Sequence, residues 1–190
     1  MSKQRQRPYP ILYPAPVILV TSIDEHGAPN VATMAWVGTV SSEPPQVAVA
    51  IRPRRYSHEA IKRAGEFVIN IPTQDQLEIV DYCGEVSKTE EDKFAATGLT
   101  AAPAAEIRTP LLAECPVNLE CQVAQIIPLG SHDLFIGKIV AVHVEESLLD
   151  EEGFIDFTLA RPIVYLGYEY WSTGQRLQRA AFTLGKKRTG

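Results

Sequence analysis

The sequence is poor in cysteine and has no excess of positive charge. Its 190 residues include three cysteines, Cys83, Cys115 and Cys121, which are odd in number and form no CxxC pair. We therefore expect neither a disulfide framework nor a metal site, and reduced thiols are typical of a cytoplasmic protein. The formal net charge is −5, with 18 Lys and Arg against 23 Asp and Glu, which argues against a nucleic-acid partner.

Long apolar runs are also missing. The longest early run, from Ile11 to Val20, is interrupted by Pro14 and Pro16. It is about half of the ~20 residues that a membrane-spanning helix needs, and the same prolines argue against a signal peptide. We therefore expect no membrane partner and a cytoplasmic location.

The composition predicts a single globular domain. Hydrophobic residues make up 45% of the chain and charged residues 22%, and 190 residues fall in the size range of one domain. Both ends are short and basic. The expected division is an N-terminal tail at residues 1–10, one domain at residues 11–184, and a C-terminal tail at residues 185–190.

Short β-strands dominate the pattern. Pro16 to Ile23 is rich in β-branched residues and ends at a polar cluster that suits a hairpin turn, Asp24 to Gly27. Val31 to Val40 is expected as a second strand and Val47 to Ile51 as a third, with Glu43-Pro44-Pro45 between them.

Two later segments alternate between apolar and other residues. Val117 to Val123 places Asn118, Glu120 and Gln122 opposite its apolar positions, which predicts a sheet with one buried and one solvated face. Cys121 is then a core residue. Val140 to Val144 repeats the pattern, and it predicts that His143 points outward.

The helices are expected to be few and short. Ser57 is a suitable N-cap for a helix to about Ala64, with Tyr56 and Ile61 in hydrophobic-staple positions. Further caps are predicted before two more helices. These are the pair Thr73 and Gln76 ahead of Leu77, Val80 and Cys83, and the pair Thr89 and Asp92 ahead of Phe94, with Gly98 as the stop signal.

Together these elements indicate an antiparallel β-barrel with short connecting helices. No strand is followed by a glycine-rich phosphate loop such as GxGxxG, which disfavours a doubly wound α/β sheet.

The stretch from Ile51 to Gly65, IRPRRYSHEAIKRAG, is the strongest chemical signal. It combines a strand end, three arginines and a helix start, and free N–H groups with positive charge favour a phosphate. The alternative is a solvated basic turn that balances Glu59 and Glu66.

Two other segments are weaker signals. Asn30 to Ser42 offers small residues and hydroxyl groups where a strand can lie close to a flat ligand. The alternative is an ordinary barrel wall with Trp36 in the core. His132, in LGSHDLFIG, lies at the mouth of a strand, where a histidine is usually a surface residue.

In combination, these segments resemble the flavin reductase-like family, and in particular its flavoredoxin-type members. The resemblance runs from about Tyr13 to Tyr170, through Asn30 to Ser42, RPRRYSHEAIKRAGEFVINIP, DKFAATGLT, ECPVNLEC and LGSHDLFIG. It implies a mainly β, Greek-key-like FMN-binding split β-barrel. It also implies a homodimer with the flavin near the subunit interface.

The resemblance also implies roles for individual residues. The edge of the flavin ring would lie against the backbone at Thr33, Met34 and Ala35, and His132 would lie close to the flavin and the incoming nicotinamide. The other cofactor-binding residues implied are Asn30, Trp36, Ser41 and Ser42 near the ring or ribityl chain, and Arg52, Tyr56, Ser57, His58 and Lys93 at the phosphate.

Three functions remain open at this stage. The first is an oxidoreductase that uses NADH or NADPH to reduce flavin, or a small acceptor through bound FMN. The second is an electron-transfer protein that keeps its FMN and exchanges electrons with a redox protein partner. The third is a β-barrel binding module without redox chemistry.

Overall fold

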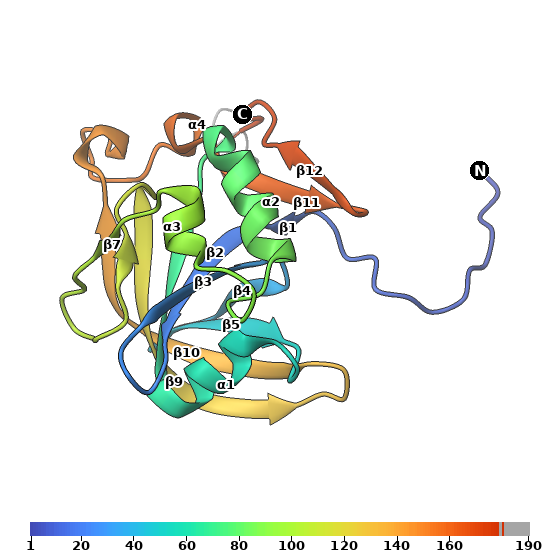
Figure 1. Cartoon of the computed structure of the whole chain (residues 1–190). Helices are drawn as coiled ribbons and strands as arrows, with labels where there is room; N and C mark the ends of the chain where they lie inside the picture. The colour runs from blue at the N-terminus through green and yellow to red at the C-terminus, as the bar shows by residue number, and fades with distance from the viewer. Residues whose placement is uncertain (179, 181–190) are drawn as a thin grey trace.

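The computed structural model describes residues 1–178 and residue 180, so the C-terminal tail expected at residues 185–190 lies outside the described residues. The chain forms a mainly β molecule with short helices around it (Figure 1). Residues 1–14 contain neither helix nor strand, and the first residues extend away from the body. Among the described residues, no helix has the length and apolar character to cross a membrane.

A seven-stranded antiparallel sheet forms the body of the molecule, in the order β3-β2-β6-β9-β10-β5-β4. A second sheet has the order β1-β11-β12, and β7 pairs with β8. The seven strands are β2 (Ile18–Ile23), β3 (Pro29–Met34), β4 (Val37–Ser42), β5 (Pro45–Ile51), β6 (Glu66–Ile71), β9 (Val117–Pro128) and β10 (Asp133–Val144). The others are β1 (Ala15–Pro16), β7 (Ala101–Ala102), β8 (Leu111–Leu112), β11 (Ile163–Leu166) and β12 (Glu169–Ser172).

The helices lie in the connections between strands. They are α1 (Tyr56–Ala64), α2 (Leu77–Glu85), α3 (Lys93–Thr97) and α4 (Phe157–Ala160), with 3-10 turns at η1 (Gln74–Gln76) and η2 (Glu146–Leu148). The antiparallel barrel with short connecting helices is therefore confirmed, and β3 to β4 and β5 to β6 are joined across intervening strands in a Greek-key-like way.

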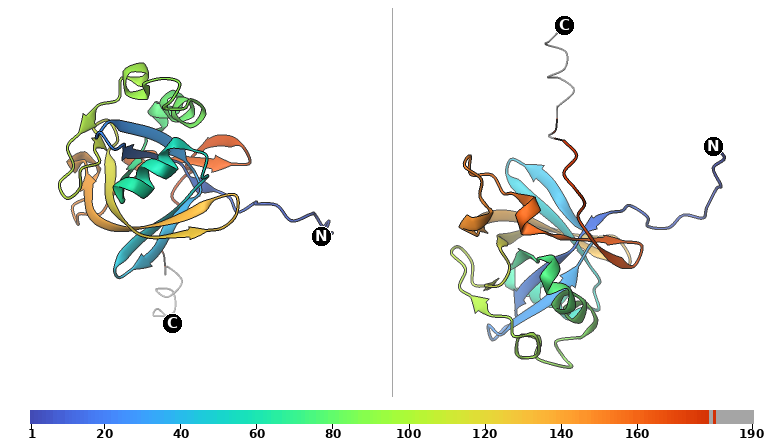
Figure 2. Two further views of the ribbon diagram at one scale, coloured as in Figure 1. Left: turned by 60° about the horizontal axis from the view of Figure 1, so that its bottom comes forward. Right: turned by 90° about the horizontal axis from the view of Figure 1, so that it is seen from above.

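The large sheet curls so that its two edge strands come close to each other without pairing. β3 and β4 are the opposite edges, yet only Ala35 and Trp36 connect them. If the sheet were flat, its edges would stand roughly 29 Å apart, whereas three Cα steps span about 11 Å. The sheet must therefore close into a barrel, as Figure 2 shows. Within the described residues β3 and β4 share no ladder, and we call this opening the seam.

The seam corrects one strand expected from the sequence. Val31 to Val40 was expected as a single strand, but the structure divides it into β3 and β4. The chain leaves one edge of the barrel at Met34 and joins the other at Val37. An apolar, β-branched pattern does not reveal this change of partner, because both halves are genuine strands.

Two apolar clusters lie on opposite faces of the barrel wall. The interior cluster includes Ile18, Val20, Phe67 and Phe135, and an exterior cluster includes Val17, Leu19, Val80 and Cys83. All six residues of β2 are consequently buried, since α2 and its neighbours cover the outside of that strand.

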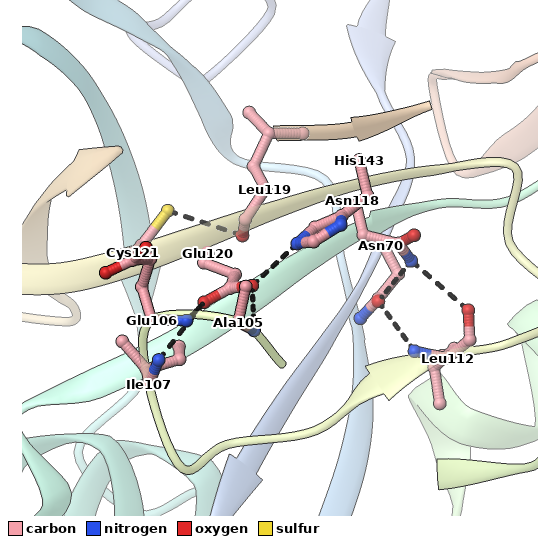
Figure 3. Close-up of polar contacts among 10 residues, drawn as sticks. All are labelled: Asn70, Ala105, Glu106, Ile107, Leu112, Asn118, Leu119, Glu120, Cys121 and His143. Atoms are coloured by element: carbon pink, nitrogen blue, oxygen red, sulfur yellow. Dashed lines mark hydrogen bonds and ion pairs between the residues drawn. The ribbon is translucent and has the colours of Figure 1, made fainter. Parts of the chain in front are cut away.

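The solvated face predicted for β9 is wrong at two positions, and Figure 3 shows the reason. Asn118 and Glu120 are buried, and Cys121 is a core residue as expected. The Glu120 carboxylate accepts hydrogen bonds from the backbone N–H groups of Ala105, Glu106 and Ile107 at 2.7 to 3.1 Å. A loop therefore covers this side of the sheet, with a polar network at the contact.

His143 lies on the outward side of the sheet as expected, opposite Asn118, but it is not a free surface residue. Its Nε2 lies 2.6 Å from Glu120 Oε1, and its side chain is partly buried (Figure 3). Val142, expected inside, is exposed. Register shifts between β9 and β10, one of them between Ile139 and Ala141, break the simple alternation.

The structure contains some of the predicted helix caps and differs from others. The capping box of Thr73 and Gln76 is present, and it precedes the 3-10 turn η1. Val80 and Cys83 are buried as expected, but Leu77 is exposed. Gly98 ends α3 with a φ of 72°, and Asp92 caps its start, so this helix begins later than Thr89 suggested.

Candidate functional site

A cavity of about 410 Å³ opens at the seam, within the size range of small-molecule sites. Asn30, Thr33, Met34, Ala35 and Trp36 line it from β3 and the crossing to β4. From the other elements, the predicted residues Arg52, Tyr56, Ser57, Lys93 and His132 line it too. The structure thus brings together ten of the thirteen residues predicted for the site.

Three predicted residues do not line this cavity. Ser41 and Ser42 lie at the far end of β4 from Trp36, next to the turn into β5. The ring of His58 is buried, and its Nε2 lies 2.8 Å from Asp133 Oδ2. Because Asp133 directly follows His132, the His58 side chain ties α1 to the loop that carries His132, and it does not reach into the cavity.

One end of the cavity is cationic. Arg52, Arg55, Lys88 and Lys93 all contribute to its lining, together with Ser57 from the first turn of α1. The first N–H groups of a helix lack partners inside the helix and favour an anion. This end is therefore suited to a compact anion such as a phosphate monoester.

The start of α1 differs from the expectation. Arg55, with extended backbone angles, is the N-cap, and no side chain caps the helix. Ser57 lies one residue inside the helix, where its Oγ accepts a hydrogen bond from Asn30 Nδ2 at 3.1 Å. The staple positions proposed for Tyr56 and Ile61 therefore do not apply, and the Tyr56 hydroxyl instead donates to Asp24.

Lys93 is a buried cation with a 3% exposed side chain. Its Nζ donates to the carbonyl oxygens of Val31 at 2.8 Å and Cys83 at 2.9 Å. In the described part of the chain no carboxylate lies within ion-pair distance of this Nζ. Burial lowers the pKa of Lys93, and the nearby Arg55 guanidinium lowers it further. An anion in the cavity would compensate this charge.

Asn30 supplies a buried acceptor atom without a partner among the described residues. Its Nδ2 bonds to Ser57, while its Oδ1 is buried and has no hydrogen-bond partner among the described residues. Asn30 lines the cavity, so its Oδ1 is a ready acceptor for a hydroxyl or N–H group of a ligand.

Trp36 and His132 form the wall beside the seam. Their ring centroids are 4.6 Å apart, and the Trp36 side chain is 42% exposed, so the alternative that placed Trp36 in the core is wrong. His132 Nδ1 lies 2.9 Å from Ser131 Oγ. Partial burial and the Arg52 charge lower the pKa of His132.

The other end of the cavity is aromatic, and sequence reasoning missed it. Tyr13, Tyr165, Tyr168 and Tyr170 line it, together with Pro10. Tyr165 contacts each of the other three tyrosines edge-on, with centroids 5.9 to 6.4 Å apart. The motif YLGYEY at residues 165–170 was the available signal, since it places three tyrosines in one hairpin.

The fold and the cavity together define a split-barrel protein with a site for a ligand that is anionic at one end and flat at the other. Residues 11–174 match the sequence profile of the flavin reductase like domain. This match spans most of the chain, which therefore belongs to the flavin reductase-like family and is of the flavoredoxin type.

Individual relatives agree with the family. An uncharacterised protein of Archaeoglobus fulgidus is 36% identical over 146 residues, 77% of this chain and 81% of that protein. The flavoredoxin of Desulfovibrio vulgaris (Miyazaki F) has a TM-score of 0.90 at 34% identity, over 97% of this chain and 100% of that one. The FMN-binding protein from Thermus thermophilus, solved with bound 1-cyclohex-2-enone, has a TM-score of 0.79 at 27% identity, over 94% and 99%.

Proposed function

We propose that this flavin reductase-like protein binds FMN and acts as an NAD(P)H-dependent oxidoreductase, reducing flavin or a small acceptor through the bound FMN. The observation that carries the proposal is Lys93, a buried ammonium that faces a cavity and has only backbone carbonyl partners among the described residues. Such a cation fits the phosphate of a bound nucleotide.

The residues present fit FMN in particular. Lys93, Arg55 and Ser57 would hold the phosphate at the cationic end, and the backbone from Thr33 to Trp36 would lie along the ring. The unpaired Oδ1 of Asn30 fits a hydroxyl of the ribityl chain. One compact cationic end suits a monophosphate better than the pyrophosphate of FAD, for which the sequence offers no glycine-rich loop. The related Thermus protein is itself an FMN-binding protein.

Few protein groups are needed for the chemistry. Bound FMN would supply hydride acceptance and transfer of one or two electrons, while the protein supplies binding, orientation and electrostatics. His132, beside Trp36 at the cavity wall, would position the nicotinamide or assist a proton. Arg52 places a positive charge close to the same wall.

A second candidate function has its own support. The similarity to a flavoredoxin favours an electron carrier that holds FMN permanently and passes electrons to a redox protein partner. Both functions use the same cavity. They differ in the nicotinamide, because a carrier needs no productive site for it.

Anaerobic stopped-flow mixing of the FMN-loaded protein with NADH or NADPH separates these candidates. Rapid, saturable bleaching of the flavin absorbance with either donor supports the reductase. No bleaching with either donor, combined with reduction by a chemical reductant, supports the carrier. A purified protein that stays colourless and does not take up FMN would support the third reading, a binding module without redox chemistry.

Two further parts of the proposal concern the molecule as a whole. We place the protein in the cytoplasm, because Cys83, Cys115 and Cys121 are free and buried. We also propose a homodimer, because apolar side chains are exposed on the barrel and around the seam, including Trp36, Val40 and Val142.

A further inference from the structure

The tyrosines of the cavity come from other elements than the start of α1. The four tyrosines come from the segment ahead of β1 and from the β11–β12 hairpin, whereas Arg55 and Ser57 belong to the start of α1. Figure 1 shows α1 and this hairpin at opposite sides of the molecule, with β4 and β5 between them. A small ligand anchored at the start of α1 therefore leaves the tip of this hairpin, with Tyr168, available for a second one.

Tyr168 stands at the tip of that hairpin in an unusual conformation. Leu166 pairs with Glu169, so Gly167 and Tyr168 form a two-residue turn, with φ angles of 55° and 76°. Positive φ at both positions is typical of Asn-Gly or Gly-Gly turns, and a bulky residue there is strained. The Tyr168 side chain is 88% exposed, yet it lines the cavity, so folding alone gives no reason for this ring.

The surrounding groups define the chemistry of a ligand. Tyr13, Tyr165 and Tyr168 present ring faces and hydroxyl donors. Burial, together with the Asp81 carboxylate, raises the pKa of Tyr170 to about 12, so its hydroxyl stays protonated. The carboxylate of Glu85 lines the same cavity and acts electrostatically on Tyr165 and Tyr170, which disfavours an anion at this end.

We propose that the tyrosines at the mouth of the cavity form a subsite for the second substrate, an uncharged planar aromatic compound that carries a hydrogen-bond acceptor, with Tyr168 as its outer wall. The ring of the ligand would stack on tyrosine faces, and its acceptor atom would receive a hydrogen bond from a tyrosine hydroxyl. The inference rests on the proposed function only in calling the ligand a second substrate. The predicted binding of the aromatic compound does not depend on that function.

Acetophenone and cyclohexyl methyl ketone are matched probes, because they share the carbonyl group and carbon skeleton and differ in the planar ring. Their affinities for the FMN-loaded, oxidised protein are measured by ligand-observed NMR without any electron donor. We expect acetophenone to bind more tightly than cyclohexyl methyl ketone. Equal affinities would overturn the aromatic subsite.

Tyr168→Gly is the decisive variant, because glycine suits a φ of 76° and the turn should keep or gain thermal stability. We expect acetophenone binding to weaken about 3- to 10-fold, as for the loss of one aromatic contact. Tyr168→Phe should keep the stacking and lose only the hydroxyl contribution. Phe154→Ala, which removes an exposed ring outside this cavity, is the control and should bind as the wild type does.

Three further outcomes would decide whether the proposed subsite exists. Unchanged acetophenone affinity in Tyr168→Gly would overturn the proposal. Loss of FMN by the same variant would also overturn it, because that result would place Tyr168 in the cofactor site. If the wild type takes up no FMN but binds acetophenone in a Tyr168-dependent way, the proposed function fails and the subsite stands.

Discussion

At the scale of single residues, Lys93 is the positive charge that we expect to bind the anionic group of a ligand in the cavity. Its ammonium is held at the cavity by two carbonyl oxygens, so it is fixed in position before any ligand arrives. A preordered cation loses little side-chain entropy on binding an anion. We expect Lys93→Met to weaken FMN binding on the order of 10- to 100-fold, the range for one charge-assisted hydrogen bond.

Fluorescence titration of FMN against Lys93→Met tests this expectation. Lys138→Met is the matched control, because Lys138 is exposed on β10 and outside the cavity. An equal loss of affinity in both variants would mean that overall charge, and not a direct contact, determines binding.

His132 is expected to affect turnover more than cofactor binding. It lies at the wall of the cavity against Trp36, and it comes from a different element than Lys93. His132→Ala should keep the flavin spectrum and FMN affinity, and lower the rate of flavin bleaching by NAD(P)H by about 10²-fold, as for a lost positioning or acid group. Wild-type bleaching kinetics would return His132 to a surface role, and loss of FMN would make it a binding residue.

At the scale of elements, Glu120 attaches a loop to the barrel wall. Burial on its own would raise the pKa of Glu120, but hydrogen bonds from Ala105, His143 and Glu106 hold it below the usual value. A carboxyl group whose pKa is lower in the folded state stabilises the fold above its unfolded pKa of about 4.3. That stabilisation is lost as the pH falls through the folded pKa.

Glu120→Gln should therefore be less stable at neutral pH by about 1 to 3 kcal/mol, because an amide N–H₂ group cannot accept from the backbone donors. The free energy of unfolding should also fall less steeply on acidification than in the wild type. Urea unfolding followed between pH 7 and pH 3 measures both effects. Glu151→Gln, which changes an exposed turn residue, is the control and should show the same dependence of unfolding free energy on pH as the wild type. If this dependence were parallel in the wild type and both variants, the role of Glu120 would be contradicted.

The local signals in the sequence were sufficient for most elements. The turn after β2, the capping box at Thr73 and the αL stop at Gly98 depend on residues close together in the chain, and the structure contains all three. The error at Glu120 has the opposite origin. Its burial depends on residues 105–107, which pack against β9 although they lie in a separate segment that the alternation within β9 does not record.

The site was predictable to a similar degree. Arg52, Ser57 and Lys93 were placed through resemblance to family motifs, and the structure brings all three to one cavity. His58 could not be separated from its neighbours in that way, because its direction depends on Asp133 across the barrel. The tyrosine wall was missed because its members belong to a hairpin far from the motifs, and sequence gives no sign that this hairpin folds back to the seam.

At the scale of the whole molecule, the expected assembly is a homodimer. Trp36, Val40 and Val142 expose apolar surface that a two-fold contact would cover. Sedimentation velocity at micromolar concentration should give about twice the chain mass of 21.0 kDa. A monomer that still retains FMN would contradict this expectation and would show that one chain completes the site.

The seam also has a consequence for how ligands reach the cavity. Separating two paired strands breaks a row of backbone hydrogen bonds, whereas the described edges of β3 and β4 share none. We therefore expect small motions at this boundary to leave the paired strands of the barrel intact, which would give a ligand a route to the cavity without partial unfolding.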